Sequence, residues 1–354
     1  MIRKRIDCWK CEACTFDHDK EENIRYLCCA MCGHERAMKR QKLNLRPPIE
    51  APIKLYEKNQ TIGREIRDDE ISKLAPVLIL RNVLQADIAN KLLHLLNNES
   101  ESWNSDFWTV FDKTNKVART HCMYTLTEEH TVESEQTRKA PELLNKVAEI
   151  ISSETHKAGF SHFCPSLILG NKYSDGKQNV GRHSDSLTVT GPRPIIAGLS
   201  VGARRIFRLY PKDNPKKFHI DLPTPHNSLI LMLPGCQEYW YHEVPSCDSP
   251  FSIRQYNGSL VRYSLTFRQE RPQFQEKLLK DSPTCHCGKP PILKSGPKGE
   301  YYLTCNPVSS SAEKSKKCEF YEVSTFAQTE AKKMIASEKE RMNEKRLLST
   351  EALV

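Results

Sequence analysis

The chain has 354 residues, a formal net charge of +9 and no run of eighteen or more apolar residues. Its length allows one domain of about 200 residues plus smaller modules. The N-terminal MIRKRIDCWKC contains no apolar stretch of the kind that signal peptides have, and nothing in the chain resembles a membrane span. We therefore expect a soluble intracellular protein without a membrane partner, and the positive charge weakly favours a polyanionic one.

The fourteen cysteines are distributed unevenly, with six in residues 8–32 and four in residues 285–318. Paired cysteines in an intracellular protein usually bind zinc. This pattern predicts five regions in chain order. They are a zinc finger at 1–38, a linker at 39–75, a catalytic-sized domain at 76–271, a second zinc finger at 281–324 and a charged tail at 325–354, which is helical or disordered.

The long middle region contains few helical patterns and many short strand patterns. The segment ADIANKLLHLLNN places apolar residues at helical spacing, whereas LILMLP, EYWYHEV and LVRYSLTFR are typical of strands. The predicted fold class is mainly β with flanking helices, as a β-sandwich or jelly roll with two small zinc-finger modules.

Three residues in this region form a candidate iron site. His183 and Asp185 are two positions apart, so on a strand their side chains leave the same face, and His242 could complete the set. Two histidines and one carboxylate form the facial triad of non-haem Fe(II) oxygenases, which leaves positions open for a cosubstrate and dioxygen. By itself the pattern is weak evidence, because surface or core histidines produce it too.

A second pattern strengthens the interpretation. Arg262, Ser264, Thr266 and Arg268 alternate along VRYSLTFR and would share one face of a strand. Two guanidinium groups near a metal suit a dicarboxylate, although strand arginines more often form surface ion pairs.

The blocks NKYSDGKQNVGRHSD, IIAGLSVGARRIFRL, YWYHEVP and RYSLTFR, in that order, resemble the AlkB family of oxidative demethylases over residues 76–271. The resemblance implies a double-stranded β-helix that uses Fe(II), 2-oxoglutarate and dioxygen to hydroxylate an N-alkyl carbon, after which formaldehyde is lost. It implies His183, Asp185 and His242 as iron ligands, and Arg262 and Arg268 on the two carboxylates of 2-oxoglutarate.

The resemblance also implies that Asn171 and Tyr173 lie on the cosubstrate side of the site. The family often has asparagine where this chain has Ser264, so we expect weaker cosubstrate binding at most. Arg119, His121 and Tyr124 in ARTHCMYTL fall where the family places its nucleotide lid, although an ordinary hairpin with an exposed tyrosine would look the same.

One departure concerns the substrate. Family members that act on methylated adenine or cytosine tend to have an acidic residue two positions after the iron aspartate, and here that residue is Leu187. The run HSDSLTVTGPRPII is instead similar to a fungal group of AlkB-like proteins that end in a GRF finger. The identity of the base therefore does not follow from the sequence.

The N-terminal cysteines form two Cys-x-x-Cys knuckles that are typical of structural zinc: Cys11, Cys14, Cys29 and Cys32. They resemble the zinc fingers of Ran-binding proteins, whose members bind single-stranded RNA or ubiquitin. Thr15, Phe16 and Met31 match the trio of the ubiquitin-binding branch, so we favour ubiquitin. The alternative is that Phe16 and Met31 only cover the core of a small zinc module.

The C-terminal cysteines resemble a GRF-type zinc finger, whose usual role is to hold single-stranded nucleic acid: Cys285, Cys287, Cys305 and Cys318. His286 could replace a cysteine, but we favour Cys287. The family's Gly-Arg-Phe appears as Gly299, Glu300 and Tyr301, and Tyr301 or Tyr302 could stack on a base.

The leading hypothesis is an oxygenase that removes alkyl groups from single-stranded DNA or RNA in alkylation repair. The alternatives are an oxygenase that acts on a protein side chain and a catalytically silent binding protein. The basic runs RKR and KRQK favour a nuclear location, alone or together with the cytoplasm.

Overall fold

The computed structural model describes residues 52–58, 60, 62–105, 119–127, 137–247, 255–288, 290–305 and 318–341, together with the backbone of 9–10, 17–18, 107–110, 113–116, 308–309 and 342–351. The chain divides into two units, residues 1–50 and 51–354. In the first unit, β1 (Trp9–Lys10) pairs antiparallel with β2 (Asp17–His18). The residues expected to bind zinc and ubiquitin there lie outside the described residues: Cys11, Cys14, Thr15, Phe16, Cys29, Met31 and Cys32.

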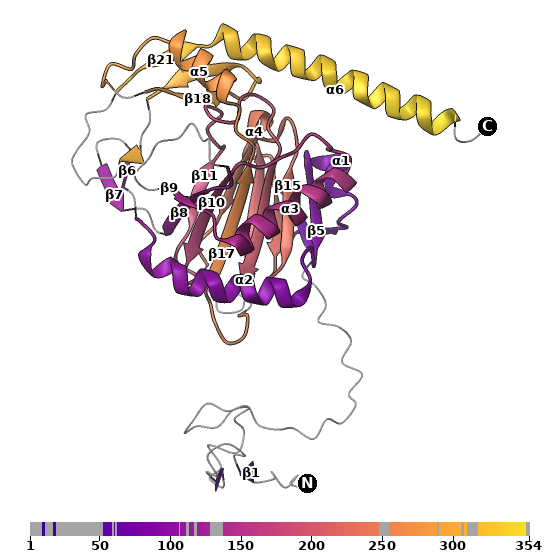
Figure 1. The fold of residues 1–354 in the computed structure, drawn as a ribbon, viewed down its shortest axis with the longest axis vertical. Coiled ribbons are helices and arrows are strands. Elements are labelled where there is room, and N and C mark those ends of the chain that lie inside the picture. Colours follow the sequence, from indigo (N-terminus) through magenta and orange to yellow (C-terminus); the bar gives the residue numbers. More distant parts are fainter. Residues whose placement is uncertain are drawn as a thin grey trace. The chain divides into compact units, whose positions relative to one another are not determined.

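The second unit is built on two β-sheets (Figure 1). The seven-stranded sheet has the order β5 (Val77–Arg81), β15 (Ser228–Met232), β12 (Ile196–Gly202), β17 (Arg262–Arg268), β10 (Leu167–Tyr173), β8 (Thr120–Thr125) and β9 (Thr137–Lys139). The six-stranded sheet has the order β11 (Val180–His183), β16 (Trp240–Val244), β13 (Arg205–Pro211), β14 (Phe218–Thr224), β3 (Ile53–Glu57) and β4 (Arg64–Ile66). From β10 to β17 the chain passes repeatedly between the two sheets, which confirms the predicted jelly roll.

Two helices, α2 (Ala86–Glu99) and α3 (Glu142–Lys157), cover the outer face of the seven-stranded sheet (Figure 1). In α2, the residues Ile88, Leu92 and Leu96 recur every four positions, so they form one apolar stripe. This stripe packs with Tyr263 and Phe267 of β17 in the largest buried cluster. The outer face of β17 is therefore core, which leaves its alternate residues to face the other sheet.

Strands β3 and β4 and a short helix lie within the region expected to be a linker, 39–75. Ile53 and Leu55 of β3 and Ile66 of β4 are buried between the two sheets, and Ile71 of the short helix α1 (Ile71–Leu74) joins them. The prediction is therefore wrong from Ile53 onward. The alternation of apolar residues in IKLYE was the signal for a strand, but the polar flanks obscured it.

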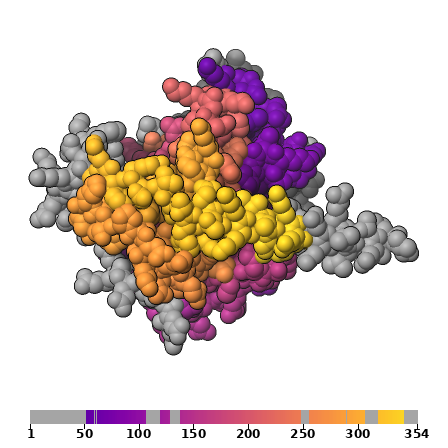
Figure 2. All heavy atoms as spheres, turned by 90° about the horizontal axis from the view of Figure 1, so that it is seen from above, coloured from indigo at the N-terminus to yellow at the C-terminus, as the bar shows by residue number. Residues whose placement is uncertain are grey.

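The C-terminal part forms a small module against the jelly roll. Strands β18 (Ile292–Ser295), β19 (Tyr301–Thr304) and β21 (Tyr321–Val323) make a three-stranded sheet. Helices α5 (Pro272–Lys280) and α6 (Thr325–Glu351) share one buried cluster with this sheet, and together they cover one end of the jelly roll (Figure 2). The expected tail is thus a helix whose first turns are part of a core.

The remaining elements are short. They are η1 (Ser100–Ser102), β6 (Phe107–Val110), β7 (Lys113–Lys116), α4 (Cys236–Tyr239) and β20 (Val308–Ser309). Backbone pairing joins β20, from the C-terminal module, to the β6–β7 hairpin. No helix in the described part of the chain is long and apolar enough to cross a membrane.

The burial of β3 yields a stability prediction. Ile53→Ala should lower the free energy of unfolding by about 2–5 kcal/mol, because it leaves a cavity between the sheets. Ile62→Ala is the matched control, because Ile62 is 83% exposed and lies between β3 and β4. Urea denaturation measures both, and equal stabilities for the two variants would contradict the assignment of β3 to the core.

Candidate active site

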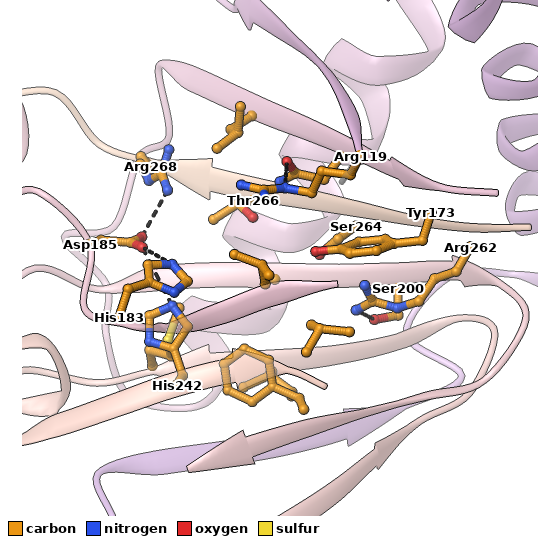
Figure 3. Close-up of a pocket in the computed structure, with 18 residues that line it drawn as sticks. Arg119, Tyr173, His183, Asp185, Ser200, His242, Arg262, Ser264, Thr266 and Arg268 are labelled. Atoms are coloured by element: carbon orange, nitrogen blue, oxygen red, sulfur yellow. Dashed lines mark hydrogen bonds and ion pairs between the residues drawn. The ribbon is translucent and has the colours of Figure 1, made fainter. Parts of the chain in front are cut away.

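The iron-site candidates meet between the two sheets (Figure 3). His183 ends β11, His242 lies in β16, and these two residues are paired across the strands. Nε2 of His183 lies 3.5 Å from Oδ1 of Asp185, and Nε2 of His242 lies 3.4 Å from the same oxygen. One ligand atom from each of the three residues lies within 4.8 Å of the others, which suits a single metal ion.

In both histidines Nε2 is the ring nitrogen that lies close to Asp185. Nδ1 of His183 donates a hydrogen bond to the carbonyl oxygen of Gly181 at 2.8 Å, so its Nε2 is free to bind a metal. The ring of His242 stacks on Phe207. Burial and the neighbouring His183 lower the pKa of His242 to about 4, so this ring is neutral at physiological pH.

Asp185 is almost fully buried and ionised. Burial acts to raise its pKa, but Arg268 and the two histidines outweigh this effect and hold the pKa well below its ordinary value. Nη2 of Arg268 donates to Oδ2 at 2.8 Å, which leaves Oδ1 facing the histidines. Asp185 does not share a strand with His183 as predicted, because β11 ends at His183 and Asp185 follows in a loop.

The predicted face of β17 lines the same space. Arg262, Ser264, Thr266 and Arg268 all border one cavity of about 100 Å³ that also contains the three iron-site residues. In register beside Ser264 lie Asn171 of β10 and Ser200 of β12, and both of these line the cavity as well. Strand alternation thus places the expected cosubstrate residues together.

Arg262 lies at the far end of the cavity from the triad (Figure 3). Its guanidinium packs over Tyr173 and donates to Oγ of Ser200 at 2.9 Å. Its Nε and Nη1 are buried and have no hydrogen-bond partner among the described residues. Burial lowers the pKa of Arg262 to about 10, so the group stays charged and requires an anion.

Positively charged side chains outnumber negatively charged ones among the described residues of the cavity. Among the described residues that line it, three arginines, Arg119, Arg262 and Arg268, face a single carboxylate, that of Asp185. Because Arg268 lies beside the triad and Arg262 at the opposite end, the cavity fits a small dianion with separated carboxylates. The donor set therefore fits Fe(II), and the two arginines fit 2-oxoglutarate.

The three residues expected in the nucleotide lid do not lie together. Arg119 borders the cavity, and its Nε donates to Oδ1 of Asn171 at 2.8 Å. His121 is the cross-strand neighbour of Asn171 and is partly exposed, but it does not line the cavity. Tyr124 is 1% exposed in the core under α2, and its hydroxyl donates to Glu99. The prediction that Tyr124 contacts substrate is therefore wrong, because strand alternation directs it to the opposite face.

Two supporting residues were not predicted. Arg205 is 1% exposed and donates to the carbonyl oxygens of Asp175, Gly176, Gln178 and Pro245, so it ties together the loops that lead into β11 and out of β16. Oε1 of Gln237 accepts a hydrogen bond from the backbone N–H of Asp185. Neither role has a sequence signal, because the partners are backbone atoms distant in the chain.

Cys285, Cys287, Cys305 and Cys318 form a second candidate metal centre. Their nearest sulfur pairs are 3.2 to 3.5 Å apart, close to the edge of about 3.8 Å for a tetrahedron with zinc–sulfur bonds of about 2.3 Å. His286 packs edge-on against Phe320 and is not part of the cluster.

The tyrosines of this module differ in exposure. Tyr301 is 2% exposed and donates to Glu238, so it cannot stack on a base as expected. Tyr302 stacks on Tyr321, whose side chain is exposed.

Comparison with known proteins agrees with this geometry. Residues 76–268, more than half of the chain, match the 2OG-Fe(II) oxygenase superfamily, and the chain belongs to this family. Over 119 residues it is 34% identical to the alpha-ketoglutarate-dependent dioxygenase alkB homolog 3 of Mus musculus, covering 32% of this chain and 38% of the relative. Over 112 residues it is 34% identical to the DNA oxidative demethylase ALKBH2 of Mus musculus, covering 30% of this chain and 44% of the relative.

The chain therefore spans less than half the length of these two relatives. Among solved structures, that of OsALKBH1 matches with a TM-score of 0.40 and 13% identity, covering 58% of this chain and 100% of that one. A prolyl hydroxylase from Trichoplax adhaerens matches with a TM-score of 0.41 and 12% identity, covering 61% of this chain and 90% of that one.

The burial of Arg262 yields a binding prediction. Arg262→Lys should weaken 2-oxoglutarate binding about 10- to 100-fold, because lysine keeps the charge but loses the planar fork. Iron binding should not change, because Arg262 is remote from the triad. Isothermal titration with 2-oxoglutarate and Mn(II) measures both, with Arg182→Lys on the exposed side of β11 as the control. Unchanged 2-oxoglutarate affinity in Arg262→Lys would contradict the assignment.

Leu187 yields a stability prediction. Its side chain is fully buried in the cluster of the C-terminal module, so this position is used for packing. Leu187→Asp should lower the free energy of unfolding by at least about 3 kcal/mol, because it buries an unpaired charge. The volume-conserving Leu187→Met should cost less than about 1.5 kcal/mol. A thermally stable Leu187→Asp protein would show that this side chain can leave the cluster.

Proposed function

We propose that the chain is an Fe(II)- and 2-oxoglutarate-dependent dioxygenase that removes alkyl groups from bases in nucleic acid, single-stranded DNA in the first place. The observation that carries the proposal is a single cavity lined by a two-histidine, one-carboxylate triad and by the buried Arg262, two of whose nitrogens have no hydrogen-bond partner among the described residues. Both named relatives are dioxygenases or demethylases of the alkB type, and one is named for action on DNA.

The roles of the residues follow from their positions. His183, Asp185 and His242 would hold Fe(II), which supplies the activation of dioxygen. Arg262, with Ser200 and Tyr173 beside it, would hold the distal carboxylate of 2-oxoglutarate, and Arg268 would keep Asp185 ionised near the other carboxylate. Because the two ends are held separately, the cosubstrate is oriented along the cavity.

The substrate side of the site is the side of Arg119. This partly exposed arginine meets the cavity at Asn171, and a guanidinium there suits a phosphate or a base edge. An alkylated base must leave its stack to reach such an enclosed site, which favours single-stranded nucleic acid. The stacked Tyr302 and Tyr321 of the C-terminal module supply an aromatic surface on which further bases could stack.

Leu187 affects which base is accepted. A leucine has no carboxylate, and this side chain is buried away from the cavity, so it cannot bind the amino group of adenine or cytosine. We therefore expect the lesion preference to differ from that of relatives with an acid at this position. Ubiquitin binding by Thr15, Phe16 and Met31 and a nuclear location stay predictions.

Incubation with alkylated oligonucleotides tests the proposal. Full-length protein with Fe(II), ascorbate and 2-oxoglutarate should release formaldehyde from single-stranded DNA that carries N-methylated bases and restore the mass of the unmodified base. His183→Ala should lose the activity because one iron ligand is missing, whereas His156→Ala on the exposed face of α3 should keep it.

The outcomes separate the hypotheses. Conversion of methylated RNA but not DNA would change the substrate class and keep the chemistry. Turnover of 2-oxoglutarate without any change in DNA or RNA would contradict the nucleic-acid substrate and favour a protein substrate. No turnover in iron-loaded protein would contradict the enzyme assignment.

A further inference from the structure

The segment that carries Asp185 is hydrogen-bonded along the edge of the C-terminal module. The backbone N–H of Leu187 donates to the carbonyl oxygen of Leu293 in β18 at 2.8 Å, and the N–H of Leu293 donates to Oγ1 of Thr188 at 2.8 Å. The side chain of Leu187 enters the buried cluster of the module. The loop after β11 is therefore fixed to β18 by backbone and side-chain contacts.

One peptide group, between Ser184 and Asp185, is held at both of its polar atoms. Nζ of Lys294 in β18 donates to the carbonyl oxygen of Ser184 at 2.8 Å. The N–H of Asp185 donates to Oε1 of Gln237 at 2.8 Å. Because a peptide group is planar, the two bonds together set its orientation, and hence the direction in which the Asp185 side chain leaves the backbone.

The hydrogen bond between Asp185 and Gln237 is also supported by β18, because Gln237 is connected to Ser295 of that strand. Nζ of Lys212 donates to the carbonyl oxygens of Gln237 and of Ser295 at 2.8 Å each. Oγ of Ser295 donates to the carbonyl oxygen of Gln237 at 2.9 Å. Lys212, Gln237 and Ser295 are all buried, so these bonds are shielded from water.

The cysteine cluster supports β18. Cys285 is buried in the same cluster as Leu293 and Leu303, and Cys305 directly follows β19, the partner strand of β18. A metal bound by the four cysteines would add to the stability that this buried cluster gives to β18.

We propose that the C-terminal cysteine module is a structural part of the iron site, with Lys294 as a positioning residue for Asp185, so that an intact module strengthens Fe(II) binding. The inference rests on the proposed iron site and is independent of the nucleic-acid substrate. Asp185 needs this support because it lies beyond the end of β11, where strand pairing no longer orients it. Loss of such a supporting contact typically weakens metal binding about 10- to 100-fold.

The test compares Lys294→Met with Lys298→Met in the full-length protein. Both remove a lysine of the same hairpin, but Lys298 is exposed. Fe(II) is titrated anaerobically in the presence of 2-oxoglutarate, and the visible charge-transfer band of the iron–2-oxoglutarate complex is recorded. Lys294→Met should need at least about tenfold more Fe(II) than the wild type for half of the band, and should reach the full band at saturating iron. Lys298→Met should titrate like the wild type.

Two further variants separate positioning from general loss of stability. Ile151→Val in the core under α3 weakens packing without touching β18, and it should titrate like the wild type. Cys287→Ser weakens the module at its exposed cysteine, and it should shift the titration in the same direction as Lys294→Met while lowering the zinc content of the purified protein.

The inference is overturned if Lys294→Met and Cys287→Ser both bind Fe(II) like the wild type, or if Ile151→Val shifts the titration as much as they do. Should Lys294→Met not fold, the titration of Cys287→Ser against that of Ile151→Val decides in the same way. Failure of the wild-type protein to form the band would instead contradict the iron site itself, so the two results are distinguishable.

Discussion

In the cavity between the two sheets, three guanidinium groups face a single carboxylate among the described lining residues, and the rest of the site depends on this excess of positive charge. Arg268 donates a hydrogen bond to Asp185, but two nitrogens of Arg262 have no hydrogen-bond partner among the described residues. Leaving such a group buried and unpaired costs free energy, so the site is built to bind a small dianion. Although burial acts to raise the pKa of Asp185, Arg268 and the two histidines hold it well below its ordinary value, so this carboxylate is ionised.

Strand β17 joins this site to the stability of the fold. Its alternate residues Tyr263, Leu265 and Phe267 are fully buried under α2 and α3, while Arg262 and Arg268 face the cavity. The core on one face therefore fixes the spacing of the two arginines on the other. The C-terminal module plays a similar part for the iron loop, because Leu187 is an apolar anchor two residues from Asp185.

The sequence predicted those parts of the site that depend on the spacing of residues within one short segment. Alternation in VRYSLTFR placed the arginines on one face, and the His-x-Asp pattern identified two members of the triad. The sequence did not show which face of β8 is directed at the cavity, so the expected contact of Tyr124 with substrate is wrong. Packing against α2, and not the alternation of residues along the strand, decides which face of β8 is buried in the core. Gln237 and Lys294 had no signal because they bind backbone atoms of a distant loop.

The most direct test of the account is a crystal structure of the protein with Mn(II) in place of Fe(II) and with 2-oxoglutarate, grown without dioxygen. We expect Nε2 of His183, Oδ1 of Asp185 and Nε2 of His242 to bind the metal, and Arg262 to bind the distal carboxylate of 2-oxoglutarate. A metal bound elsewhere, or a cosubstrate whose carboxylates leave Arg262 without a partner, would contradict it.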